Sequence, residues 1–306
     1  MKTRALWAVG LALAAVLWLP SFATGGTTER VSVDSEGNQA NGTSSGRSIS
    51  ADGRFVAFGS TASNLVPSDA NGTWDIFIRD RGTATTNPST RRVSIATDGG
   101  DPNAYSGLPV ISADGQSVAF ESQATNLVAG ERNGFMDVFV WDAATTPKIT
   151  RVSVASDGTE ANGDSGMGGM TPDGQRVVFW SDATNLVAGG TNGARNVFVH
   201  DRVSGETTLA SVAADGGLPN GSSDFGSISA DGRFVAFVSY ATNLVAGDTN
   251  GVRDAFVRDL LLGVTRRVSV ASDGTQANGE SRYGTALSAD GRYVAPPDLS
   301  TEVPTQ

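Results

Sequence analysis

Hydrophobic residues along this chain come in short runs that are too brief for helices. Runs of Val, Phe and Ile such as 55–58 and 75–78 are bounded by Gly, Asn, Asp and Ser, a pattern typical of β-strands joined by tight turns. After the first two dozen residues, no long window has the 3.6-residue period of an amphipathic helix. The pattern predicts an all-β protein.

The runs recur in a long repeat with three landmarks. Val-Ser-Val or a close variant returns about every 58 to 62 residues, starting at positions 31, 93, 152, 210 and 268. A Ser-Ala-Asp-Gly turn or a variant starts at positions 50, 112, 171, 229 and 288. A segment such as Asp-Ile-Phe-Ile starts at positions 75, 137, 196 and 254. A repeat of this length is the signature of a blade-like unit.

Each unit predicts four strands. The first ends at the Asp-Gly turn, a hairpin signal in which Gly takes positive φ. The second is the Phe-Val-Ala-Phe segment, the third is Asp-Ile-Phe-Ile, and the fourth carries Arg-Val-Ser-Val. Four strands per repeat favour a β-propeller over a string of separate small β domains, because a lone four-stranded sheet has little core.

The units divide residues 24–306 into four full blades and a partial fifth within one propeller domain. The approximate repeats are 29–90, 91–150, 151–208, 209–265 and 266–306. After Ala295 the chain reads Pro296-Pro297, and proline cannot continue a central strand. Two hypotheses are open. The strand around Val31 closes a five-bladed ring with the last pair, or the chain is truncated and has an open edge.

The turn and strand sequences resemble the WD-like repeat of TolB-type β-propellers. The segments that carry the resemblance are Ser-Ala-Asp-Gly-Arg-Phe-Val-Ala-Phe at 50–58 and again at 229–237, Asp-Ile-Phe-Ile-Arg-Asp at 75–80, and Arg-Arg-Val-Ser-Ile at 91–95. The resemblance covers 29–295 and implies the fold. TolB itself has an α/β domain before its propeller, and this chain is expected to have none, so the role of TolB does not follow.

The first 23 residues predict a secretory signal peptide. Lys2 and Arg4 precede an apolar run over 5–19, and Ser21-Phe22-Ala23 has small residues where the peptidase requires them. We therefore expect a secreted or periplasmic protein that does not insert into a membrane. The formal net charge of -10 argues against nucleic-acid binding. We expect a monomer that binds a protein or a cell-envelope polymer.

The binding surface is expected on the face of the long loops, which join strand two to strand three and strand four to the next blade. A specific site should use positions where the repeats differ. One such column lies before strand three, and another lies at the entrance of strand one, where the types match interface anchors. The candidate partner-binding residues are Trp74, Met136, Arg195, Arg253, Leu108, Met167 and Phe225.

Two of the long loops also have the oxygen-rich pattern Asp-x-Asn-Gly-x-x-Asp. Calcium prefers such hard ligands, although Asp, Asn and Gly are equally the residues of an ordinary turn. No other cofactor is indicated. A calcium-binding structural repeat protein is therefore the alternative function. The candidate metal ligands are Asp69, Asn71, Asp75, Asp248, Asn250 and Asp254.

Catalysis is not expected from this composition. The chain has no cysteine and one histidine, His200, which excludes thiolate chemistry and a zinc or manganese site with several imidazoles. A propeller hydrolase or lyase with paired carboxylates is formally open, but no pair is distinguished from the repeated acidic residues. The sequence therefore predicts a protein that is not an enzyme.

Overall fold

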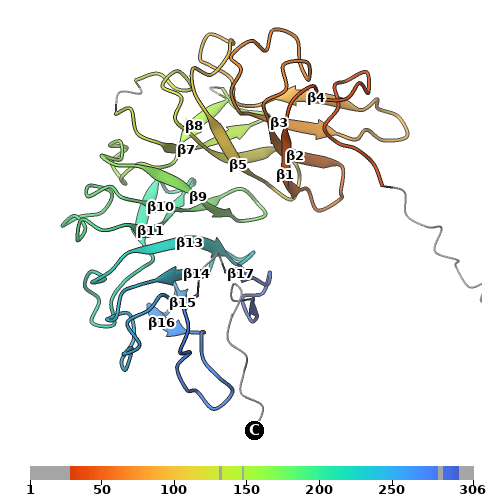
Figure 1. Ribbon diagram of the computed structural model, residues 1–306. Coiled ribbons are helices and arrows are strands. Elements are labelled where there is room, and N and C mark those ends of the chain that lie inside the picture. The colour runs from red at the N-terminus through yellow and green to blue at the C-terminus, as the bar shows by residue number, and fades with distance from the viewer. Residues whose placement is uncertain (1–27, 131–132, 147, 282–284, 296–306) are drawn as a thin grey trace, which may run out of the picture. The chain divides into compact units, whose positions relative to one another are not determined.

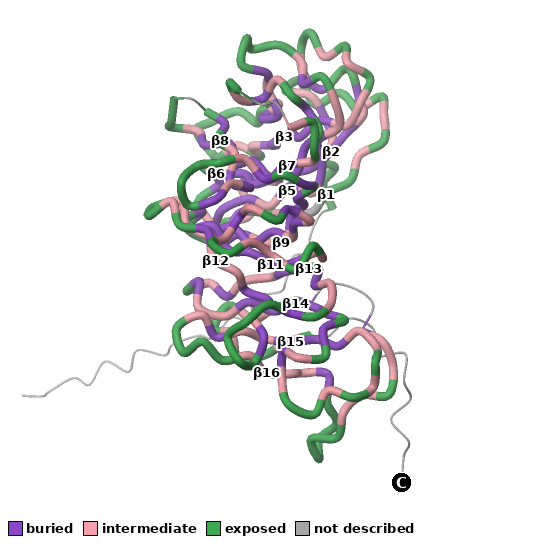
Figure 2. Tube along the Cα trace, turned by 90° about the vertical axis from the view of Figure 1, so that its left-hand side faces the viewer, coloured by how far each residue is buried: buried purple, intermediate pink, exposed green. Residues whose placement is uncertain are grey.

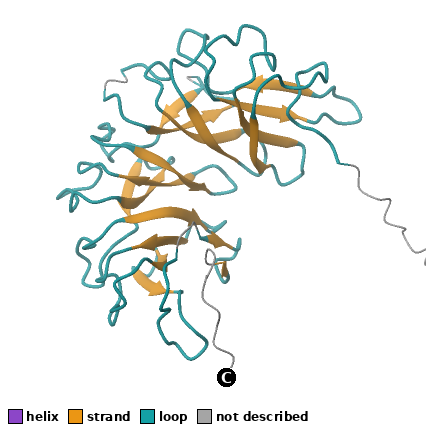
Figure 3. Ribbon diagram, in the orientation of Figure 1, coloured by secondary structure: helices purple, strands orange, loops and turns teal. Residues whose placement is uncertain are grey.

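The computed structural model describes residues 28–130, 133–146, 148–281 and 285–295. The chain divides into two units, Met1–Arg30 and Val31–Gln306, and the fold described below lies in the second. The predicted signal peptide lies outside the described residues. Within the described ranges every regular element is a strand, as Figure 3 shows. These ranges contain no helix that is long and apolar enough to span a membrane.

The strands form four antiparallel four-stranded sheets and one two-stranded sheet (Figure 1). This is a β-propeller of four full blades and a partial fifth, as predicted. Blade 1 contains β1 (Ser44–Ile49), β2 (Phe55–Ser60), β3 (Asp75–Asp80) and β4 (Ser89–Arg92); blade 2 contains β5 (Ser106–Ile111), β6 (Ser117–Ser122), β7 (Asp137–Asp142) and β8 (Ile149–Arg151). Blade 3 contains β9 (Ser165–Met170), β10 (Arg176–Ser181), β11 (Asn196–Asp201) and β12 (Glu206–Leu209); blade 4 contains β13 (Ser223–Ile228), β14 (Phe234–Ser239), β15 (Asp254–Asp259) and β16 (Val264–Arg267).

The Asp-Gly turn is a hairpin fastened by side-chain hydrogen bonds. In blade 1 the Asp52 carboxylate accepts hydrogen bonds from the Ser50 hydroxyl at 2.6 Å and from the Arg54 amide at 2.9 Å. Gly53 has φ +72°, which a residue with a side chain rarely adopts. The same serine hydroxyl accepts from the Phe55 amide, so Ser, Asp and Gly together fix where β1 ends and β2 begins.

Strand four differs from its prediction. β4 ends at Arg92, one residue before the Val-Ser-Ile segment. The Ser94 hydroxyl turns inward, accepts a hydrogen bond from the Ile76 amide at 3.0 Å and donates to the Asp75 carboxylate at 2.8 Å. The recurring serine therefore caps the start of strand three instead of extending strand four.

The core lies within the blades and between neighbouring blades. Each full blade has a buried phenylalanine pair on its two middle strands, with ring centroids 5.7 to 5.9 Å apart. Buried residues of neighbouring blades share clusters, as Ala57 and Ile76 of blade 1 do with Phe120 of blade 2. Figure 2 shows that buried residues follow the strands while the connections are exposed. The middle strands of the four full blades are largely buried on both faces, and their central positions are apolar.

Main-chain hydrogen bonds also join successive blades at their hairpin turns. The Ala51 amide donates to the Ala113 carbonyl at 2.9 Å, and the Ala113 amide donates to the Pro172 carbonyl at 2.7 Å. Blade 4 donates in the same way from Ala230 to Ala289. Pro172 has no amide hydrogen, so blade 3 cannot donate this bond to blade 4.

The partial fifth unit consists of β17 (Ala286–Leu287) and β18 (Val294–Ala295), and β17 contacts β13 and β14. The predicted strand around Val31 does not join this pair among the described residues. Instead Val33 forms an isolated bridge with Gln39, and its carbonyl accepts a hydrogen bond from Thr90 of blade 1 at 2.5 Å. The equivalent segment before blade 3 contacts Thr207 in the same way, so this N-terminal segment is a normal part of blade 1.

Candidate functional site

The long-loop face brings three of the predicted residues into one cluster. Arg195 precedes β11, Arg253 precedes β15, and Phe225 lies on β13. Asp224 links the two arginines, accepting from Arg195 Nη1 at 3.0 Å and from Arg253 Nη2 at 2.9 Å. We call this group, with Trp180, Asp182 and Tyr240, the arginine–aromatic cluster.

Arg195 is held from three sides. Its guanidinium lies 3.7 Å from the centroid of the Trp180 ring and forms a bidentate pair with Asp182 at 3.0 and 2.9 Å. The hydrogen bond to Asp182, followed by the one to Asp224, raises the pKa of Arg195. A cation stacked and paired in this way is pre-organised, because little rotamer freedom remains to be lost when a ligand binds.

The aromatic rings beside Arg253 are the exposed part of the cluster. Its guanidinium lies 4.8 Å from the Tyr240 ring centroid and 5.8 Å from that of Phe225. Tyr240 and Phe225 are 45% and 42% exposed. The Tyr240 hydroxyl donates to Glu280 at 2.6 Å, and this bond raises the pKa of the phenol. Two rings thus reach solvent beside a cation whose charge Asp224 partly balances.

Phe225 also has an unusual backbone. Its φ is +55°, and the equivalent Leu108 of blade 2 has φ +49°. Both lie at irregularities in the pairing of the first strand of the blade, β13 with β14 and β5 with β6. Left-handed backbone at a large residue costs energy and is often associated with functional sites. The bulge turns the Phe225 side chain out of the sheet.

Trp74 and Leu108 form a second group between blades 1 and 2. They line a groove of about 280 Å³ together with Tyr105 and Gly59. The Trp74 ring covers Gly59, where an added Cβ would lie 3.3 Å from it. This groove does not share residues with the arginine–aromatic cluster.

The two methionines are placed differently. Met136 is half-buried, and its amide donates to Asp164 at 2.8 Å. Met167 is 5% exposed and belongs to the core between blades 2 and 3, where its amide donates to the buried Glu121 carboxylate at 3.0 Å. The expected surface position of Met167 is therefore corrected, because strand pairing with β10 turns it inward.

The comparison of equivalent positions among the repeats did not predict four residues of the arginine–aromatic cluster, namely Trp180, Asp182, Asp224 and Tyr240. They lie on or just after strand two and at the start of strand one, at positions treated as core or loop. The signal was present, because the column of Trp180 reads Gly59, Glu121, Trp180 and Val238 in successive blades. Comparing all columns would have found it.

The candidate metal ligands of blade 1 surround an arginine. Arg92 Nη1 lies 3.5 Å from Asp69 and 3.4 Å from Asp75, and its Nη2 lies 2.6 Å from Asp101. Asn71 donates its amide to Asp75 at 2.9 Å. Burial raises the pKa of Asp75 to about 6, despite the opposing hydrogen bond from Ser94 and the charge of Arg92.

Blade 4 repeats this arrangement. Arg267 Nη1 lies 3.4 Å from Asp248 and 3.9 Å from Asp254, and Asn250 donates to Asp254. Burial raises the pKa of Asp248. Within the described ranges no three acidic or histidine side chains are grouped so that they could hold a metal ion. The guanidinium groups take the place expected for the cation, and calcium binding itself stays a prediction.

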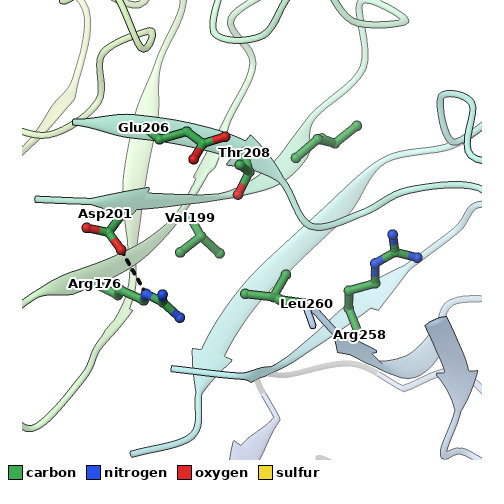
Figure 4. A pocket seen from close by; sticks show the side chains of 8 residues that line it. Arg176, Val199, Asp201, Glu206, Thr208, Arg258 and Leu260 are labelled. Atoms are coloured by element: carbon green, nitrogen blue, oxygen red, sulfur yellow. Dashed lines mark hydrogen bonds and ion pairs between the residues drawn. The ribbon is translucent and has the colours of Figure 1, made fainter. Parts of the chain in front are cut away.

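A further pocket of about 240 Å³ lies at the seam between blades 3 and 4 (Figure 4). Arg176 is paired with Asp201 at 3.0 Å there, while Arg258 and Leu260 approach from blade 4. His200 of blade 3 is 7% exposed, and its Nδ1 lies 2.8 Å from the Thr207 hydroxyl. Burial lowers the pKa of His200.

No protein-family model matches the chain, and no curated protein matches it. Solved structures do show likeness. A putative TolB from Agrobacterium tumefaciens is 16% identical, with 81% of this chain and 65% of that one covered at a TM-score of 0.45. An oligogalacturonate lyase in complex with manganese is 12% identical, with 85% of this chain and 62% of that one covered at a TM-score of 0.47. A Pyrococcus horikoshii acylaminoacyl peptidase is 13% identical, with 84% of this chain and 36% of that one covered at a TM-score of 0.43. The chain spans less than two thirds of the length of each.

The prediction that the chain is not an enzyme is wrong as an exclusion. Structures with this likeness include a lyase and a peptidase. The fold is therefore compatible with enzymes.

Proposed function

We propose that this chain is an exported, TolB-like propeller that binds a protein or a cell-envelope polymer through its long-loop face, in the periplasm or outside the cell. The observation that supports this best is the arginine–aromatic cluster. It places two rings that are 42% and 45% exposed beside guanidinium groups already fixed by Asp182 and Asp224. Aromatic residues and arginine are the types most often found at binding hot spots.

The shape of the cluster favours an extended partner. Phe225 and Tyr240 are exposed on the surface, and the separate groove at Trp74 between blades 1 and 2 is small, at about 280 Å³. Flat aromatic surfaces suit protein segments and the faces of polymer units. The left-handed backbone of Phe225 supports a role that packing alone does not require.

The test compares wild type with Phe225→Ala plus Tyr240→Ala, because truncating hot-spot rings typically costs more than about 1 kcal/mol each. Binding is measured by co-sedimentation with purified peptidoglycan and by pull-down from an envelope extract. A matched control is Val203→Ala plus Leu261→Ala, which removes side chains that are 75% and 74% exposed on the turns between strands three and four.

We expect the cluster variant to lose at least about tenfold in affinity and the control to bind like wild type. Peptidoglycan binding would identify a polymer partner, and pull-down without it would identify a protein. Equal recovery of wild type and the cluster variant in both assays would reject this surface.

A further inference from the structure

Blade 2 has an apolar pocket on its outer strands, separate from the arginine–aromatic cluster of blades 3 and 4. Its volume is about 470 Å³, within the usual range for small-molecule sites. Trp141 of β7 and Ile149 of β8 form one wall. Ile95, from the connection that precedes the blade, and Leu127, from the loop after β6, form the others.

The pocket exists because blade 2 lacks a polar pair that other blades have at this position. In blade 1, Arg79 donates to Thr90 at 3.0 Å, and Thr90 donates to the carbonyl of the preceding connection at 2.5 Å. In blade 3, His200 and Thr207 form the same arrangement, and Thr207 donates to Val154 at 2.5 Å. These bonds pull the connection onto the outer strands.

Blade 2 has Trp141 and Ile149 at those two positions, and isoleucine has no hydroxyl to donate. The connection is fastened elsewhere, since the Thr97 amide donates to the Asn126 carbonyl at 2.9 Å. The space between the connection and the outer strands is therefore left open and is lined by apolar groups. Apolar groups that line an open pocket stay in contact with water, and an apolar ligand that covers them is stabilised by their burial.

Trp141 is held rigidly as a wall. Across the seam from blade 1, the Arg91 guanidinium lies 4.6 Å from its ring centroid. Figure 4 shows the equivalent seam between blades 3 and 4, where Arg258 stands at the position of Trp141. Trp141 is 3% exposed, so its ring is packed firmly against its neighbours.

The charge at the pocket is positive. Among the residues that line it, Lys148 is the charged one, and its Nζ lies 5.7 Å from the Trp141 ring centroid. Nζ donates to the Ala143 carbonyl at 2.8 Å, and an ammonium group has further donors available. The sequence contains two lysines, Lys2 and Lys148, in a chain of net charge -10.

We propose that this pocket binds a small amphiphilic carboxylate, with the apolar part between Trp141 and Leu127 and the carboxylate at Lys148. An apolar cavity with one cation at its edge is complementary to that chemistry, whereas a neutral ligand leaves the ammonium unpaired and a cationic one is repelled. The proposal does not depend on the function of the long-loop face.

Calorimetric titration of the full chain with decanoate, decanol and decyltrimethylammonium tests the ligand class, with the two ions below their micelle concentrations and decanol below its solubility limit. We expect decanoate to bind at one site, decanol to bind several times more weakly, and the cation not to bind. In Lys148→Gln, decanoate should weaken about threefold to fivefold, as for an exposed ion pair, and decanol should be unchanged. Arg266→Gln, which removes another exposed cation, in blade 4, should bind like wild type.

Trp141→Arg plus Ile149→Thr tests the pocket by giving blade 2 the pair found in blade 1. We expect decanoate binding to fall by at least about tenfold. A location test that needs no variant is acetylation of wild type with mass spectrometry, in which decanoate should protect Lys148 and leave the N-terminal amine reactive. Equal affinity for decanoate and decanol, unchanged binding by the double variant, or no protection of Lys148 would each overturn the proposal.

Discussion

Replacing Arg92 by leucine tests whether the buried arginine is the cation that the oxygen-rich loops require. Arg92 is 8% exposed, and its partner Asp75 is fully buried. Removing one partner of a buried ion pair typically costs about 3 to 5 kcal/mol, because the remaining charge is left without compensation. We expect Arg92→Leu to lower the free energy of unfolding by about that amount at pH 8.

The loss should depend on pH because burial raises the pKa of Asp75 to about 6 from 3.8. The folded chain keeps a proton on Asp75 that the unfolded chain has released between those values. The stabilisation that protonated Asp75 contributes is therefore complete below about pH 4 and is lost as the pH rises through 6. Over that range the free energy of unfolding falls by about 3 kcal/mol in total. Without Arg92 this pKa rises further, so the cost of the variant should fall to less than half at pH 4.5.

Blade 3 provides the matched rescue. Where blade 1 has Arg92, Asp75, Asp69 and Asp101, blade 3 has Leu209, Asn196, Gly190 and Leu218, so the cation and its three acidic partners are replaced together. Introducing all four blade 3 residues into blade 1 should recover most of the stability lost by Arg92→Leu alone. Urea unfolding at pH 4.5 and pH 8 measures both variants. A loss below about 1 kcal/mol at pH 8, or no recovery in the fourfold variant, would refute this account.

Two further predictions concern calcium and acid. If the guanidinium groups replace a bound ion, millimolar calcium should leave the Tm of wild type unchanged after EDTA treatment and should raise the Tm of Arg92→Leu; a calcium-dependent rise in wild type would support the calcium alternative instead. Burial lowers the pKa of His200, so the folded chain resists protonation that the unfolded chain accepts, and its contribution to stability is lost as the pH falls through the ordinary range of histidine. His200→Arg, which has the residue type of Arg79 and Arg258, should flatten that part of the pH–stability curve, and an unchanged curve would contradict the assignment.

Much of the fold could be predicted from sequence, because strands two and three are buried on both faces and bounded by a turn of fixed chemistry. The fourth strand could not be placed, since Val-Ser-Ile has the composition of a strand. Its serine instead binds the first residues of strand three, and that contact joins residues 18 or more positions apart.

The site was found only in part for a similar reason. Arg195, Arg253 and Phe225 lie in columns that visibly differ between repeats. Trp180 and Tyr240 lie at the end of strand two, and their importance depends on which arginine approaches them from another element. The arginines beside the acidic loops were missed because the loop motif and its cation lie on different strands.

Pro172 has a mechanical consequence. The turns of blades 1, 2 and 4 each donate a main-chain bond to the next unit, but the junction after blade 3 lacks that donor. It keeps the main-chain bond from the Ser223 amide to the Arg195 carbonyl at 2.9 Å and the side-chain pair between Arg195 and Asp224. Under a pulling force, that junction should part before the others. A ligand that binds residues of both blades would hold them together, so the force needed to separate them would rise when the surface is occupied.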